Sequence, residues 1–179
     1  MAMAASSSGW TLDELHRLPD DGNKYELVRG ELFVAPAPSM EHETIIARLN
    51  AHLLPYVMKH SLGLVYHART VIRADGSEVE PDLMVRPEMT MTGGDWENAP
   101  MPILVVEVTS PSTRRRDLTE KRTLYRGIGV AEYWVIDPPS RRVHVIRPAR
   151  PDSAVVEQLT WHPDGAPDPL CIQVAQLFA

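Results

Sequence analysis

The sequence contains little cysteine and no long apolar run. Cys171 is the one cysteine among 179 residues, so no disulfide can form within the chain, as is common in proteins of a reducing compartment. Because Cys171 lies between Leu170 and Ile172, we interpret it as a small buried apolar residue. No segment approaches the ~18 apolar residues of a membrane span, and residues 1–9 lack the basic and apolar regions of a signal peptide. The sequence therefore predicts a cytoplasmic protein that has no membrane partner and begins with a disordered leader over residues 1–9.

The motifs of several enzyme classes are also missing. Ile46 stands where a zinc metalloprotease that begins with His42 and Glu43 would need its second histidine. No dinucleotide fingerprint, P-loop or G-x-S-x-G elbow occurs. The net charge of -6 argues against a protein that coats nucleic acid, because such proteins are usually strongly basic. It does not exclude a nucleic-acid enzyme, since only the groove that meets phosphate must be positive.

The pattern of apolar residues predicts one α/β domain over residues 10–179. We expect a short helix at 11–17, a hairpin of strands 25–28 and 31–34, and a helix at 42–59, followed by strands at 64–73, 79–86 and 103–108, a helix at 117–126 and a strand at 132–136. Extra strands are predicted at 142–147 and 155–161. A helix, three strands, a helix and a strand form a sandwich around a mixed sheet.

Two carboxylates stand out in this pattern. Glu107 interrupts the apolar run of residues 103–108, which is typical of a central strand, and an unpaired charge there would be costly. Asp82 follows Pro81 at the start of another apolar strand. If these strands are neighbours, both carboxylates can bind Mg²⁺ or Mn²⁺, and such an ion would polarise a phosphate and activate a water. Taken alone, Asp82 would be interpreted as a turn or strand-start residue.

Basic residues gather on the predicted helix at 117–126 and directly before it. Asp117, Lys121 and Tyr125 follow at four-residue intervals and therefore share one helix face. Lys121 could supply fixed positive charge for phosphodiester hydrolysis, or it could form a simple exposed ion pair with Asp117. The arginines of this region either contact phosphate or form a solvated helix start: Arg114, Arg115, Arg116 and Arg122.

Two further polar residues allow two interpretations each. Glu31 follows Gly30, so it either closes the hairpin or reaches the metal as an additional ligand. His42 stands at the start of a predicted helix, where it is either a polar residue of the helix cap or a part of the site.

Several spaced blocks resemble the Uma2 (DUF820) family. Residues 25–32 read YELVRGEL, similar to the family's YEL-x-x-GEL opening, and His42 follows at the expected place. Residues 81–83 (PDL) and 106–113 (VEVTSPST) resemble the PDL and EV-x-SPST blocks. The series Asp117, Lys121 and Tyr125, followed by GVAEYW at 129–134, is similar to D-x-x-x-K-x-x-x-Y…GV-x-EYW.

This resemblance implies a restriction-endonuclease-like PD-(D/E)XK fold with an αβββαβ core. It implies that Asp82 and Glu107 bind a divalent metal, that nucleic acid is the substrate, and that the protein is a homo-oligomer. In the parent motif a lysine stands two residues after the glutamate, whereas this chain has Thr109 there. The resemblance implies that Lys121 replaces that lysine.

The leading hypothesis is a metal-dependent endonuclease that acts on nucleic acid, with DNA as the expected substrate. Its expected catalytic residues are Asp82, Glu107 and Lys121, Glu31 is a third metal ligand, and the supporting residues are His42, Asp117, Tyr125 and Thr109. One alternative is a catalytically inactive nuclease fold that binds nucleic acid or a partner protein. Another is a metallo-hydrolase of a small phosphoester. We also expect a homodimer, for which the strand at 142–147 could present an edge.

Overall fold

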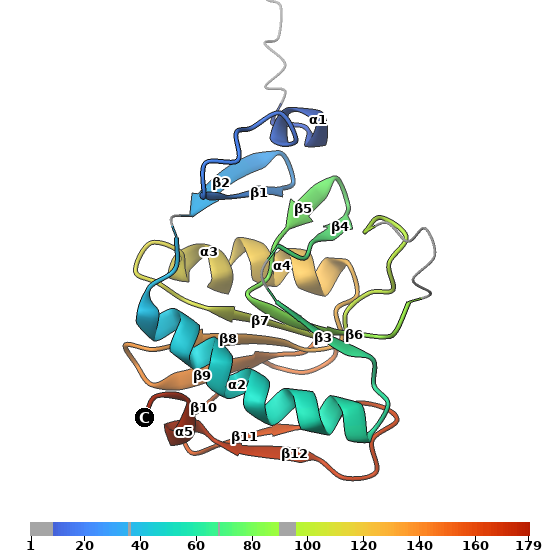
Figure 1. Cartoon of the computed structure of the whole chain (residues 1–179), viewed down its shortest axis with the longest axis vertical. Coiled ribbons are helices and arrows are strands. Elements are labelled where there is room, and N and C mark those ends of the chain that lie inside the picture. Colours follow the sequence, from blue (N-terminus) through green and yellow to red (C-terminus); the bar gives the residue numbers. More distant parts are fainter. Residues whose placement is uncertain (1–8, 36, 68, 90–95) are drawn as a thin grey trace, which may run out of the picture.

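A six-stranded sheet forms the middle layer of the protein (Figure 1). A computed structural model describes residues 9–35, 37–67, 69–89 and 96–179. In spatial order the strands of this sheet are β10 (Ser153–Val155), β9 (Arg142–Ile146), β8 (Tyr133–Asp137), β7 (Leu104–Val108), β6 (Leu83–Arg86) and β3 (Leu64–His67). β7 and β8 are parallel and the other neighbours are antiparallel, so the predicted mixed sheet is confirmed.

The described part of the chain also forms two smaller sheets and five helices. The four-stranded sheet has the order β2 (Glu31–Ala35), β1 (Lys24–Val28), β5 (Ser77–Val79) and β4 (Ile72–Ala74), and a hairpin joins β11 (Gln158–Trp161) to β12 (Leu170–Gln173). The helices are α1 (Leu12–Leu15), α2 (Met40–Lys59), α3 (Arg114–Leu118), α4 (Glu120–Gly127) and α5 (Val174–Leu177). None of the helices in the described part of the chain is long and apolar enough to cross a membrane.

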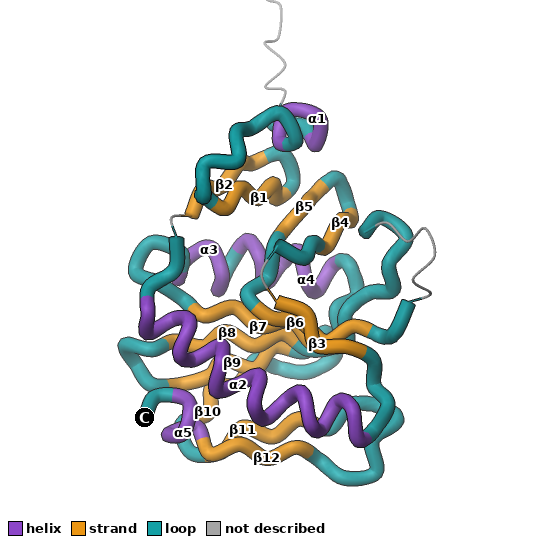
Figure 2. The backbone as a smooth tube through the Cα atoms, in the orientation of Figure 1, coloured by secondary structure: helices purple, strands orange, loops and turns teal. Residues whose placement is uncertain are grey.

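The predicted αβββαβ core is present as α2, β3, β6, β7, α4 and β8. Side chains alternate between the two faces of each strand. On β7, Val106 and Val108 face the apolar core beneath α2, whereas Val105 faces a second core that contains Leu124 of α4. Figure 2 shows α2 on one side of the sheet and α3 and α4 on the other. Glu107 lies two residues after Val105 and therefore faces the same side of β7, toward α4.

Three predicted strands are each divided between two sheets. The strand expected at 64–73 is β3 and β4, the one expected at 79–86 is β5 and β6, and the one expected at 155–161 covers the end of β10 and all of β11. Apolar alternation shows which face of a strand is buried but not which sheet the strand joins, so the crossing at residues 80–82 left no signal. The predicted helix at 117–126 is also divided. Thr119 adopts φ -124° and ψ -77°, and its hydroxyl donates to the carbonyl of Arg115 at 2.7 Å, a local bond that competes with the helix.

Three smaller expectations have different outcomes. Cys171 is exposed rather than buried, because its neighbour Ile172 takes the inward face of β12. The short helix expected at 11–17 is α1, which begins with a capping box of Thr11 and Glu14. The leader over residues 1–9 stays a prediction, because residues 1–8 lie outside the described part of the chain.

Gly63 determines how closely β3 approaches β6. It has φ +119°, and a Cβ at this position would lie 2.1 Å from the carbonyl oxygen of Arg86. Leu64 pairs with Arg86 in the next step of the ladder. We expect Gly63→Ala to lower the free energy of unfolding by about 3 kcal/mol, since it adds a clash to backbone strain. Urea denaturation followed by circular dichroism measures this change.

Gly76→Ala is the matched control for that prediction. Gly76 also has a positive φ, +66°, but a Cβ there meets no atom within 4 Å. Gly76→Ala should therefore lower the free energy of unfolding only by the strain of the left-handed conformation, about 1 kcal/mol. Equal losses in the two variants would contradict the packing role of Gly63.

Candidate active site

The register of β6 and β7 brings two carboxylates side by side. Leu83 pairs with Val106 in this antiparallel ladder. The residue before Leu83 is Asp82 and the residue after Val106 is Glu107, so these two stand opposite each other on the face toward α4. The backbone N–H of Val108 donates to Asp82 Oδ2 at 2.8 Å. Asp82 and Glu107 both line a cavity of about 560 Å³.

Lys121 of α4 binds Glu107 directly. Its side chain is wholly buried, and Nζ donates to Glu107 Oε1 and to Glu26 Oε1 at 2.7 Å each. One helical turn later, the Tyr125 hydroxyl donates to the same Glu107 oxygen at 2.9 Å. Asp117 is buried as well, so the interpretation of Asp117 and Lys121 as an exposed helix ion pair is wrong.

Two residues of β1, Lys24 and Glu26, complete this charged cluster, and neither was predicted from the sequence as a site residue. Glu26 is fully buried and accepts the backbone N–H of Glu80 at 2.9 Å in addition to Lys121. Lys24 Nζ lies 3.1 Å from Asp82 Oδ1, 3.8 Å from Glu26 Oε1 and 4.0 Å from Glu107 Oε2. The available signal was two opposite charges at alternate positions, on one face of a strand.

The structure separates Glu31 from the other predicted site residues. Glu31 is exposed at the start of β2, opposite Val28 in the hairpin, and it lines a different groove together with Arg122. The same hairpin carries Glu26 into the cluster. The predicted metal ligand of this hairpin is therefore misplaced: Glu31 pairs with Val28 and so shares the face of Glu26, but it lies at the turn, two residues further along the ladder from the cluster.

Three of the four predicted supporting residues line the cavity, and the fourth, Tyr125, contacts the cluster through Glu107. His42 Nε2 lies 3.0 Å from Asp82 Oδ2, while Ser39 caps α2 by accepting the His42 N–H at 3.2 Å. His42 thus belongs to the site and does not act as the cap itself. Asp117 and Thr109 also line the cavity. The Thr109 hydroxyl is buried and has no hydrogen-bond partner among the described residues.

Three of the four predicted phosphate-binding arginines are paired with carboxylates outside the cavity. These pairs are Arg114 with Asp137 at 3.0 Å, Arg115 with Glu120 at 2.9 Å and Arg122 with Asp152 at 2.6 Å. Arg116 alone of the four lines the cavity. It lies 3.3 Å from Glu26 Oε2 and stacks over the ring of Phe33 at 5.0 Å. The arginines therefore form several separate ion pairs rather than one open basic surface.

Burial and close charges shift the pKa values of this cluster in opposite directions. Burial raises the pKa of Glu107 to about 7, although Lys121 and Lys24 oppose the rise. Burial acts in the same sense on Asp82, but Lys24 and the bond from His42 hold its pKa well below the ordinary range. The pKa of Lys24 is raised because Glu26, Asp82 and Glu107 outweigh its own desolvation. Asp82 and Lys24 are therefore charged at neutral pH, and Glu107 titrates near it.

The cluster fits a cation that keeps much of its own water. In the described part of the chain, no three His, Cys, Asp or Glu side chains converge closely enough to hold a metal by themselves. Asp82 and Glu107 present two carboxylates to an open cavity, and Mg²⁺ is commonly bound by one or two carboxylates together with waters and substrate phosphate. The donor set therefore fits Mg²⁺ or Mn²⁺ better than a metal that needs an all-protein cage.

Comparison with known proteins identifies the family. The family model of Uma2, described as "Putative restriction endonuclease", matches residues 12–174. Among solved structures, the chain is similar to "a putative nuclease belonging to DUF820 from Anabaena variabilis ATCC 29413", with 21% identity, 94% of this chain and 97% of that chain covered, and a TM-score of 0.76. No curated protein matches the chain. The structural match confirms the predicted restriction-endonuclease-like fold, and because the family model covers most of its length, the chain belongs to the Uma2 family.

Proposed function

We propose that the protein is a divalent-metal-dependent endonuclease that hydrolyses phosphodiester bonds in nucleic acid, with DNA as the expected substrate. The observation that carries the proposal is the pair of carboxylates, Asp82 and Glu107, that faces one cavity and is backed by the buried Lys121. The description of the Uma2 family and that of the similar Anabaena variabilis protein as a nuclease support the same activity.

Asp82 and Glu107 would hold Mg²⁺ or Mn²⁺. When bound, such an ion polarises a phosphate oxygen and lowers the pKa of a water. The two oxygens of Asp82 have different roles: Oδ2 already accepts from Val108 and His42, whereas Oδ1 faces Lys24. His42 and the Val108 N–H therefore orient Asp82 so that Oδ1 is the oxygen available to a cation.

Lys121 is a positioning residue in this proposal. It is wholly buried and both of its short contacts are to carboxylates, so it does not reach a phosphate in the cavity. Its charge favours the ionised form of Glu107, and its bond, together with that of Tyr125, fixes the carboxylate in one orientation.

Lys24 is the cation that would meet the phosphate. Its ammonium group is surrounded by Asp82, Glu26 and Glu107 within 4.0 Å, which is the region where a divalent cation would be attracted. Two cations repel each other at such short range, so Lys24 must leave Asp82 when the metal site is filled. Lys24 lines the cavity, and its flexible stem allows the ammonium group to turn toward a bound phosphate.

One observation favours a second candidate function, a catalytically inactive protein that binds a partner. Arg114, Arg115 and Arg122 are neutralised by carboxylates, and Glu41, Glu43 and Glu80 line the cavity. The surface near the site thus offers a polyanion less free positive charge than expected. Nucleic acid would have to be held mainly by Lys24, Arg116 and the metal, because Arg69, the other arginine that lines the cavity, is paired with Asp20 at 3.4 Å.

The direct test is cleavage of plasmid and single-stranded DNA in Mn²⁺, Mg²⁺ or EDTA. We expect metal-dependent cleavage that falls roughly 100-fold or more in Asp82→Asn, and likewise in Lys121→Met. Glu31→Gln is the matched control, because it removes a carboxylate that lies outside the cavity, and it should cleave at the wild-type rate. Absence of cleavage by a wild-type protein that still binds Mn²⁺ would favour the inactive alternative.

Lys24→Met separates the role of Lys24 from that of the metal ligands. Removing its ammonium group should raise Mn²⁺ affinity roughly tenfold, because a competing positive charge is lost, and should lower cleavage roughly 100-fold. Calorimetry and DNA cleavage measure the two effects. Arg69→Met, which removes another cation that lines the cavity, should change neither by more than about twofold. Unchanged or weaker Mn²⁺ binding in Lys24→Met would contradict the proposed role.

Metal binding should also depend on pH through Glu107. Its pKa is raised to about 7, so below pH 7 the metal must displace a proton from this carboxylate. The apparent Mn²⁺ affinity should then fall roughly tenfold per pH unit below 7 and level off above it. Calorimetry from about pH 5.5 to about pH 8 would measure this change in affinity, because that range extends about 1.5 units below and about 1 unit above the pKa of Glu107. A constant affinity below pH 7 would show that Glu107 is not a ligand.

A further inference from the structure

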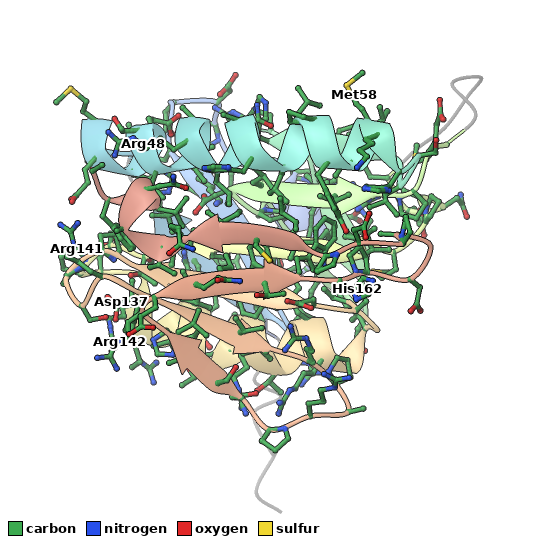
Figure 3. All side chains as sticks on the ribbon, turned by 90° about the horizontal axis from the view of Figure 1, so that it is seen from below. Arg48, Met58, Asp137, Arg141, Arg142 and His162 are labelled. Atoms are coloured by element: carbon green, nitrogen blue, oxygen red, sulfur yellow. The ribbon has the colours of Figure 1, made fainter. Side chains whose placement is uncertain are left out.

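Helix α2 carries an apolar stripe on the side that faces away from the sheet. Its inner face contributes Ile45, Leu49 and Leu53 to the core. The outer stripe, defined here as Met40, Ala47, Ala51, Leu54 and Met58, is exposed along its whole length. Met40 is 86% and Met58 67% exposed, and Figure 3 shows Met58 pointing away from the body of the protein.

The spacing of the outer stripe is that of a helix–helix contact. Its members are separated by seven, four, three and four residues, which is the a/d pattern of a helix that packs against another helix. From Met40 to Met58 the stripe extends about 27 Å at 1.5 Å per residue. Single exposed apolar residues are common on protein surfaces, but here four of the five members, from Ala47 to Met58, follow one another on adjacent turns, with Thr44 between them and Met40. Such a stripe indicates an interface.

The outer stripe is nearly symmetric about its own centre. Met40 and Met58 lie at equal distances from residue 49, and so do Ala47 and Ala51. If a second α2 is laid antiparallel across the first, each Met40 meets a Met58 and the alanines meet at the centre. Small residues at the centre allow two helix backbones to approach closely. A parallel arrangement would instead place Met40 against Met40.

The charges of α2 select the same arrangement. Its first turn carries Glu41 and Glu43, and its last turn carries Lys59. An antiparallel pair puts the acidic end of each helix beside the basic end of the other, twice by symmetry, and opposes the two helix dipoles. In a parallel pair, like charges would meet at both ends. The surface is therefore complementary to a second copy of itself.

We propose that the protein forms a two-fold symmetric homodimer through antiparallel contact of the two outer stripes. This places the interface on α2 and not on the predicted strand at 142–147, since β9 lies between β8 and β10 inside the sheet. Glu41 lines the cavity of the candidate active site, so the partner subunit's Lys59 lies at the rim of that cavity. Each copy thereby adds one positive charge to the acidic rim of the other.

The first test measures mass in solution by sedimentation equilibrium at micromolar concentration. We expect twice the mass of the chain for the wild type, and a dimer dissociation constant raised at least 100-fold by Ala51→Glu, which puts two carboxylates at the centre of the contact. Ala131→Glu changes another exposed alanine and should remain dimeric. A wild-type monomer, or an Ala51→Glu variant that dimerises normally, would overturn the proposal.

Cross-linking tests the antiparallel orientation without destabilising the contact. In a Cys171→Ser background, Met40→Cys combined with Met58→Cys should give a covalent dimer under mild oxidation. Either substitution alone should not, because the two copies of the same position lie about 27 Å apart at opposite ends of the helices. Efficient cross-linking by a single variant would overturn the antiparallel arrangement. Neither experiment depends on nuclease activity, so failure of the proposed function would leave both results interpretable.

Discussion

The buried ammonium group of Lys121 is the interaction on which the candidate site depends. By donating to Glu26 and Glu107 at 2.7 Å each, it joins α4 to β1 and to the central strand β7. Burial of a charge costs several kcal/mol unless its partners are well placed, so none of these groups is stable in the interior without the others. The packing of α4 against the sheet and the position of the β1–β2 hairpin must therefore agree within the tolerance of a hydrogen bond. That requirement also fixes the orientation of Glu107.

The four-stranded sheet extends the restriction-endonuclease-like core and contributes to its chemistry. The core supplies Asp82, Glu107 and Lys121, whereas β1 adds Lys24 and Glu26. Because β5 joins β1 and continues into β6, the crossing that ends at Asp82 ties the hairpin to the edge that carries Asp82 and Glu107. The backbone N–H of Glu80 makes this connection directly by donating to Glu26.

Helix α2 connects the core, the cavity and the surface. Leu49 and Leu53 pack beneath the sheet, His42 in the first turn holds Asp82, and the opposite face exposes Met40 and Met58. A helix whose two sides are both apolar has little freedom to rotate once both are covered. Contact between two copies would for this reason also hold His42 in place at each cavity.

The sequence by itself determined most of the secondary structure and the central part of the site. An aliphatic run broken by Glu107, an aspartate before a second apolar strand and a lysine on a helix face were enough to predict one cluster, and the spaced motifs identified the family. Periodicity cannot show which sheet a strand joins, so it predicted the strands at 64–73 and 79–86 as continuous. For the same reason it favoured Glu31 over Glu26 and missed Lys24. Those choices depend on which part of the hairpin meets α4, and only tertiary packing decides that, because the cost of a buried charge is set by neighbours far away in the chain.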